Sequence, residues 1–172
     1  MKTIKILTIL FITVFSNCSQ AQRLNNLTET EYNNIKINNI NWQTISDTKG
    51  NATEIRNLLG DGLMNTQGAE PSLHIEFWND SKGIYLYFEE NNPNIVNDYI
   101  LHDFTISNNQ SSITVKGKII TIGDDISLLG NEQINVSGTD ISFSTNYTDD
   151  ILMIKFDSRS KEITSIEYTS FN

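Results

Sequence analysis

The segment Ser81–Glu90, SKGIYLYFEE, has the alternating pattern of a half-buried β-strand, and the pattern recurs in Thr148–Asp157, TDDILMIKFD. In both segments a turn-forming start leads into apolar residues at every second position, which is the period of a strand that buries one face. The recurrence predicts that one structural unit occurs twice along the chain. The matching apolar positions are Ile84, Leu86 and Phe88 in the first segment and Leu152, Ile154 and Phe156 in the second.

A second pair of matching segments comes before these strands. Ile35–Trp42, IKINNINW, and Ile113–Ile120, ITVKGKII, both place apolar residues on either side of a short turn. Asn39 and Gly117 occupy matching turn positions, and both residue types tolerate the positive φ that a tight hairpin requires. We therefore expect a β-hairpin at each segment, with Trp42 continuing the second strand of the first hairpin.

A helix is predicted after the first hairpin and a shorter one after the second. Asn51 can cap the segment ATEIRNLL, whose apolar residues form one stripe, and Gly60 ends it. After the second hairpin only Asp124–Gly130, DDISLLG, has helical character, enough for about one turn. The Gly-rich segment Leu59–Gly68 follows a helix rather than opening one, so it is predicted to be a loop over the end of the sheet.

The predicted fold class is α+β, with two tandem repeats of a hairpin, a helix and a three-stranded antiparallel meander. The repeats cover residues 35–106 and 113–171. Neither repeat could bury its strands under one short helix, so the two sheets are expected to share one core. The polar segment 22–34 is predicted to be a linker with a single helical turn, capped by Thr28 with Glu31 three residues later.

This layout resembles tandem-repeat α+β envelope proteins, such as the beta-lactamase inhibitory protein and BamE-like lipoproteins. The string VKGKIITIGDDISLL, from Val115 to Leu129, is also similar to repeats of exported proteins that carry a domain of unknown function. The shared pattern is a Gly-centred hairpin followed by Gly-Asp and a short helix, although those families generally begin with helices where this chain begins with a hairpin. The resemblance implies a binding or accessory role.

The first residues of the chain, 1–21, predict an export signal. Lys2 and Lys5 accompany an apolar run that is too short to span a bilayer, and no later segment is long and apolar enough to do so. The small-x-small sequence ending at Ala21 predicts cleavage there. The alternative is lipidation of Cys18, which would give a lipid-anchored protein. We therefore expect a periplasmic or secreted protein, or an envelope-anchored lipoprotein if Cys18 is acylated.

The net charge and the absence of catalytic and nucleotide-binding motifs argue against several classes of function. The net charge of −9 argues against nucleic acid as a partner, because phosphate binding needs clustered Lys and Arg. Cys18 is the single cysteine, which leaves the folded part without a disulfide or a thiol nucleophile. The sequence has no nucleophile elbow, no H-E-x-x-H and no glycine-rich nucleotide loop. We expect no catalytic residues, no metal and no cofactor.

The outward faces of the strands differ between the two repeats. Successive strand residues point to opposite faces, so the residues between the inward apolar positions point outward. Trp and Tyr are enriched among interface anchors, which makes the outer face of the first repeat the candidate binding face; alternatively, the N-terminal segment or the other repeat covers these rings. The outward residues are His74, Glu76, Trp78, Tyr85 and Tyr87, against Ser142, Ser144, Asn146, Met153 and Lys155, and the candidate binding face is His74, Trp78, Tyr85 and Tyr87.

The same region also allows an enzymatic hypothesis. If strands 73–78 and 99–104 came together, His74, Glu76 and His102 would form a His-Glu-His site of the kind that binds a metal. Three function classes therefore follow. The first is a non-enzymatic binding or accessory protein whose partner is another envelope or extracellular protein. The others are a small metal-dependent or hydrolytic enzyme, and a structural outer-membrane lipoprotein that requires Cys18 at its mature N-terminus.

Overall fold

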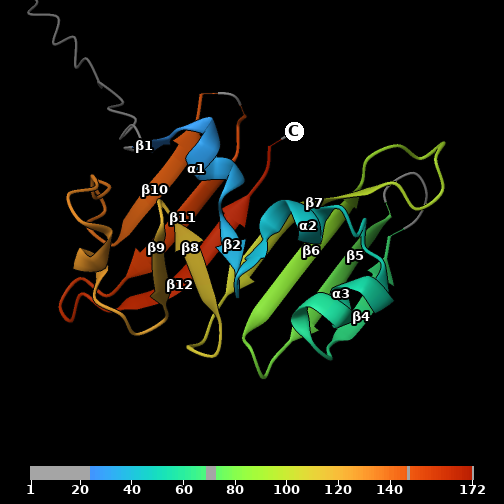
Figure 1. The fold of residues 1–172 in the computed structure, drawn as a ribbon, viewed down its shortest axis with the longest axis horizontal. Helices are drawn as coiled ribbons and strands as arrows, with labels where there is room; N and C mark the ends of the chain where they lie inside the picture. The colour runs from blue at the N-terminus through green and yellow to red at the C-terminus, as the bar shows by residue number, and fades with distance from the viewer. Residues whose placement is uncertain (1–23, 69–72, 147, 172) are drawn as a thin grey trace, which may run out of the picture.

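Two β-sheets, in which most neighbouring strands are antiparallel, form the body of the protein (Figure 1). The computed structural model describes residues 24–68, 73–146 and 148–171, and these form an eight-stranded and a four-stranded sheet. With its helices the chain is a mixed α+β protein, as predicted. In order across the large sheet, the strands are β1 (Leu24–Leu27), β10 (Asp140–Thr145), β11 (Ile151–Phe156), β12 (Ile163–Thr169), β7 (Tyr99–Ile106), β6 (Ile84–Glu90), β5 (His74–Asn79) and β4 (Leu63–Gln67).

The small sheet consists of the two predicted hairpins. Its order is β3 (Ile40–Asn41), β2 (Lys36–Ile37), β8 (Ser112–Val115) and β9 (Lys118–Thr121), and the hairpins pair with each other along β2 and β8. Both turns have two residues with positive φ, as a tight hairpin of this hand requires. These residues are Asn38 (50°) and Asn39 (67°) in the first turn, and Lys116 (50°) and Gly117 (73°) in the second.

The helices begin and end at the capping residues. In α3 (Ala52–Leu59), the Asn51 side chain accepts hydrogen bonds from the first-turn amides, and Gly60 ends the helix with φ of 90°. The predicted single turn of the second repeat is the 3₁₀ helix η1 (Ile126–Leu129). One prediction was wrong here: Trp42 does not continue a strand but begins α2 (Trp42–Ser46), because the Asn41 side chain accepts from the Gln43 amide and caps a helix.

One hydrophobic core lies between the large sheet and the layer formed by the small sheet and the helices. In Figure 1 this layer lies in front of the large sheet. Buried residues of both halves of the chain form one cluster. Burying each large side chain stabilises the fold by roughly 1.5–3 kcal/mol. Phe77, Leu86, Phe104 and Phe143 contribute from the large sheet, and Ile37, Val115, Ile55 and Leu59 from the covering layer.

The segment predicted to be a loop over the sheet end contains a strand. Within Leu59–Gly68, β4 pairs antiparallel with β5 from Leu63 opposite Trp78 to Gln67 opposite His74. The strand lies at the sheet edge and is mostly exposed, so its sequence, LMNTQ, has no apolar alternation. Only Met64 of this strand is partly buried against the core, so the alternating signal of a half-buried strand is absent.

The segment predicted to be a linker, 22–34, is folded from residue 24 onward. β1 pairs in parallel with β10, and α1 (Glu29–Asn33) follows with the predicted capping box between Thr28 and Glu31. Leu27 and Tyr32 of this segment are buried in the core. The large sheet therefore gains an edge strand from a polar stretch whose partner is more than a hundred residues away in the chain.

The predicted export signal lies outside the described residues. Residues 1–21, and Cys18 among them, have no described structure, so cleavage after Ala21 and lipidation of Cys18 stay predictions. In the ranges that the structure does describe, no helix combines the length and the apolar character needed to cross a membrane.

Candidate binding face on the large sheet

The face of β5, β6 and β7 that points away from the core carries a group of aromatic rings. Along β5 and β6, buried residues alternate with half-buried ones. Ile75, Phe77 and Leu86 are buried, whereas the residues between them lie on the other face. We refer to the outward side chains His74, Trp78, Tyr85, Tyr87 and His102 as the aromatic face.

The rings of the aromatic face contact one another across the strands. The Tyr87 ring lies 5.1 Å from the ring of His74 and 5.8 Å from that of His102, measured between centroids. Trp78 and Tyr85 are directly opposite each other in the register, with centroids 5.7 Å apart. Tilted and edge-on pairs of this kind contribute about 0.5–1.5 kcal/mol beyond area burial. The rings therefore form a preorganised surface.

A β-bulge brings His102 onto this face. Tyr87 is opposite Asp103, but the next pair joins Phe88 to Leu101, so His102 is the extra residue on β7. An extra residue bends its strand locally and redirects the neighbouring side chains. Alternation from the sequence does not show where a register shifts, which is why His102 was not predicted as part of the aromatic face.

Carboxylates surround the rings. Glu76 accepts hydrogen bonds from the Tyr85 hydroxyl at 3.0 Å and from Gln67 Nε2 at 2.9 Å. Asp103 lies 3.0 Å from His102 Nδ1, and Glu89 lies 3.6 Å from its Nε2. Among the described outward positions of β4 to β7 there is no Lys or Arg.

Burial and, secondarily, the neighbouring carboxylates raise the pKa of both tyrosines on this face. Burial, followed by the hydrogen bond to Glu76, raises the pKa of Tyr85 above its ordinary value. Burial also raises the pKa of Tyr87, and the negative charges of Glu89 and Asp103 raise it further. Nearby negative charge disfavours a phenolate, so both hydroxyls stay neutral and able to donate hydrogen bonds.

A groove extends the aromatic face to the edge of the sheet. It has a volume of about 380 Å³ and lies between Leu63, Trp78 and the turn at Asp80 and Ser81. Leu63 of β4 is opposite Trp78 and is 71% exposed. The apolar surface is therefore continuous from the strand edge to the tyrosines.

The residues of the proposed enzyme do not converge. β6 lies between β5 and β7, so the Tyr87 ring separates His74 from His102. Glu76 is held by Tyr85 and by Gln67 instead. Strands 73–78 and 99–104 are therefore not adjacent, and the condition on which the His-Glu-His site depended is not met. Within the described residues, no group of three or more His, Cys, Asp or Glu side chains could hold a metal ion.

No family model, no curated protein and no solved structure matches this chain. The resemblance to tandem-repeat envelope proteins of the BamE-like kind therefore stays a prediction. The function has to be inferred from the geometry and chemistry of the chain's own residues.

Proposed function

We propose that this protein is an exported, non-enzymatic binding protein of the cell envelope, and that it holds a partner protein against the aromatic face. The single observation that carries this proposal is the row of half-exposed rings in mutual contact across β5, β6 and β7. Trp and Tyr are the residue types that most often anchor protein interfaces. Three neighbouring strands offer a broad surface, which suits a protein better than a small molecule.

The charge of the surface favours a basic partner. Glu76, Glu89 and Asp103 lie among the rings, and no cationic side chain on the described outward positions of β4 to β7 neutralises them. An Arg or Lys side chain could contact a ring face and a carboxylate at once, because aromatic faces attract cations. Such charge complementarity speeds association and selects among partners. We therefore propose that the partner presents Arg or Lys toward Tyr87.

We also propose that the two halves of the chain, 35–106 and 113–171, are copies of one unit. The order of elements supports this: a hairpin with a two-residue turn of positive φ, a helix or helical turn closed by a Gly, then strands that pair with their neighbours. The pairing pattern supports it as well. β7 and β12, the last strands of the two halves, pair antiparallel in the middle of the large sheet, and β2 pairs with β8. In this proposal, the partner-binding surface arose when the outer-face residues of the first half diverged from those of the second half.

Affinity capture from envelope extract tests the binding proposal when it is run with matched variants. Tyr85 and Met153 occupy matching positions of the two halves. Tyr85→Ala changes the aromatic face of the first half, whereas Met153→Ala changes the outer face of the second half. We expect Tyr85→Ala to weaken the captured complex by about tenfold or more, which is the effect of losing an interface anchor. Met153→Ala should leave the complex unchanged. Equal capture by both variants would overturn the proposal.

A further inference from the structure

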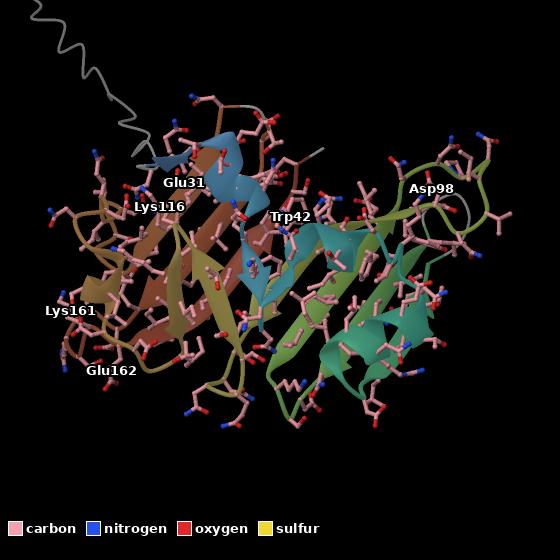
Figure 2. All side chains as sticks on the ribbon, viewed as in Figure 1. Glu31, Trp42, Asp98, Lys116, Lys161 and Glu162 are labelled. Carbon is pink, nitrogen blue, oxygen red and sulfur yellow. The ribbon has the colours of Figure 1, made fainter. Side chains whose placement is uncertain are left out.

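A pocket lies on the opposite side of the large sheet from the aromatic face. It has a volume of about 250 Å³ and is formed where α1 and α2 meet the ends of β7 and β12. Figure 2 labels Trp42 at this place, in front of the sheet. The residues that matter for its chemistry are Tyr32, Trp42, Gln43, Ser46, Asp150 and Tyr168.

Aromatic rings form the walls of this pocket. The Trp42 ring lies 5.1 Å from that of Tyr32 and 5.6 Å from that of Tyr168, between centroids. Trp42 Nε1 donates to the Tyr32 carbonyl oxygen at 3.2 Å, and Tyr168 stacks on Phe104 with centroids 5.1 Å apart. Each ring is therefore held by a neighbour, and the walls are preformed.

The pocket contains a buried carboxylate that is only half satisfied. Asp150 is 3% exposed, and its Oδ2 accepts a hydrogen bond from the Tyr32 hydroxyl. The other oxygen, Oδ1, is buried and has no hydrogen-bond partner within the described part of the chain. No described Lys, Arg or His forms an ion pair with Asp150. Leaving one oxygen of a buried carboxylate without a hydrogen bond, and the group without a cationic partner, is unfavourable.

The neighbouring hydroxyls do not supply a positive charge. Burial raises the pKa of Tyr32, and its hydrogen bond to Asp150 raises it further. Burial also raises the pKa of Tyr168, whose hydroxyl lies 3.1 Å from that of Tyr32. Both phenols are therefore neutral, and the negative charge of Asp150 stays uncompensated beside the aromatic walls.

We propose that this pocket binds an alkylammonium group, supplied by a small amine or by a lysine side chain. A cation there would lie between the Asp150 carboxylate and the lining rings of Trp42, Tyr32 and Tyr168, and carboxylates and aromatic rings both attract ammonium groups. The volume suits a ligand of a few heavy atoms or one extended side chain. The inference concerns a different surface from the aromatic face and does not depend on the function proposed for it.

Tryptophan fluorescence gives a direct test. The chain has two tryptophans, so Trp78→Phe leaves Trp42 as the single reporter in the pocket. The probes are n-butylammonium chloride and Nα-acetyl-lysine methylamide, with n-butanol and sodium chloride as neutral and ionic controls. We expect a saturable change with the ammonium probes alone, and at least about tenfold weaker binding in Asp150→Asn. Tighter binding of one probe would distinguish a free amine from a lysyl group as the ligand.

A second pair of variants keeps the test independent of whether Asp150→Asn folds. Gln43 is exposed and lines the pocket, so Gln43→Lys brings an ammonium group to the pocket from within the chain. We expect Gln43→Lys to abolish the ammonium response and the uncharged control Gln43→Met to keep it; the melting temperature does not discriminate, because Gln43 Nε2 donates to Asp47 at 3.0 Å and a lysine could pair with that carboxylate instead. No saturable response to either ammonium probe in the Trp78→Phe protein, an equal response to n-butanol, or identical behaviour of Gln43→Lys and Gln43→Met would overturn the proposal.

Discussion

The outer faces of the two halves of the large sheet have opposite character, although the inner faces are alike. In the first half, β5 and β6 bury Phe77, Leu86 and Phe88, and in the second half β10 and β11 bury Phe143 and Ile154. Both halves therefore bury large apolar side chains on the face that points toward the core. Selection for packing constrains buried positions, whereas outer positions are free to change with function.

In the second half, a loop covers part of the outer face of the sheet, and an ion pair neutralises charges elsewhere on that face. Ser142 is fully buried and accepts a hydrogen bond from Asn135 Nδ2 at 2.9 Å, so the loop after η1 folds over the strand. Lys155 pairs with Glu167 across β11 and β12 at 2.7 Å. The first half instead leaves rings and carboxylates half-exposed, such as Tyr87 and Glu76. The difference indicates which face is available to a partner.

The largest expected effect comes from the inner positions that the two halves share. Ile37→Asp and Val115→Asp each place an unpaired charge at a site that is 0% exposed, so each should lower the free energy of unfolding by several kcal/mol. Urea unfolding measures both, with the exposed Lys118→Asp as a control on β9. A large loss for one variant and almost none for the other would contradict the proposed equivalence of the halves.

Two tyrosine–carboxylate pairs offer the next comparison. Tyr32→Phe removes the hydrogen bond to Asp150 Oδ2, while the other carboxylate oxygen has no partner within the described residues, so we expect a loss of about 1–3 kcal/mol. Tyr85→Phe leaves Glu76 bonded to Gln67 and half-exposed, and its loss should be near 1 kcal/mol or less. Denaturant unfolding of the two variants under the same conditions measures the difference. A larger loss for Tyr85→Phe would show that the Asp150 cluster does not support the fold.

The Tyr32–Asp150 pair also predicts that the stability of the fold depends on pH in the alkaline range. Burial raises the pKa of Tyr32 in the folded state, so the unfolded chain ionises first, from its ordinary value near pH 10 upward. The stability that depends on neutral Tyr32 is complete below pH 10 and is lost as the pH rises above it. Unfolding free energies measured between pH 8 and about 11 should therefore fall more steeply in the native sequence than in Tyr32→Phe. Parallel curves would contradict this assignment.

A smaller effect on stability is expected on the aromatic face itself. If the rings serve a partner, Tyr87→Ala should lower the melting temperature by only a few degrees, the equivalent of about 1 kcal/mol, while it weakens binding by on the order of 2 kcal/mol. Melting curves of Tyr87→Ala and Met153→Ala, measured under the same conditions, distinguish a ring that contacts a partner from one that stabilises the fold. A large fall for Tyr87→Ala would mean that the ring serves the fold, and the proposed binding face would then be wrong.

The smallest effect is expected on the outer face of the second half. Burial acts to raise the pKa of Glu167, but hydrogen bonds from Lys155 and Ser165 together lower it. The stability from this pair is present above the ordinary carboxylate pKa near 4.5 and is lost as the pH falls through the lowered value. Lys155→Met should cost less than about 1 kcal/mol at pH 7 and nothing at low pH. A loss that persisted in acid would contradict an ionic origin.

Sequence alone was sufficient at most places where the signal is local, and the missed helix cap at Asn41 is the exception. The hairpin turns at Asn39 and Gly117, the cap at Asn51 and the short turn closed by Gly130 all lie where the residue types predicted. A turn or cap depends on the φ preference and hydrogen bonds of a few consecutive residues. The inward and outward sides of β5 and β6 followed in the same way from strict alternation.

Tertiary structure decided what depends on distant partners. The edge strand β4 and the parallel strand β1 carry little pattern of their own, because each is defined by the strand it pairs with. The bulge that places His102 beside Tyr87, and the strand that separates His102 from His74, follow from register and strand order. The Asp150 pocket joins residues that are far apart in the chain, and only their burial together leaves one oxygen of this turn-forming Asp buried without a described hydrogen-bond partner. Local preference thus determines which segments form elements, whereas the desolvation and pairing of specific side chains arise only when those elements meet.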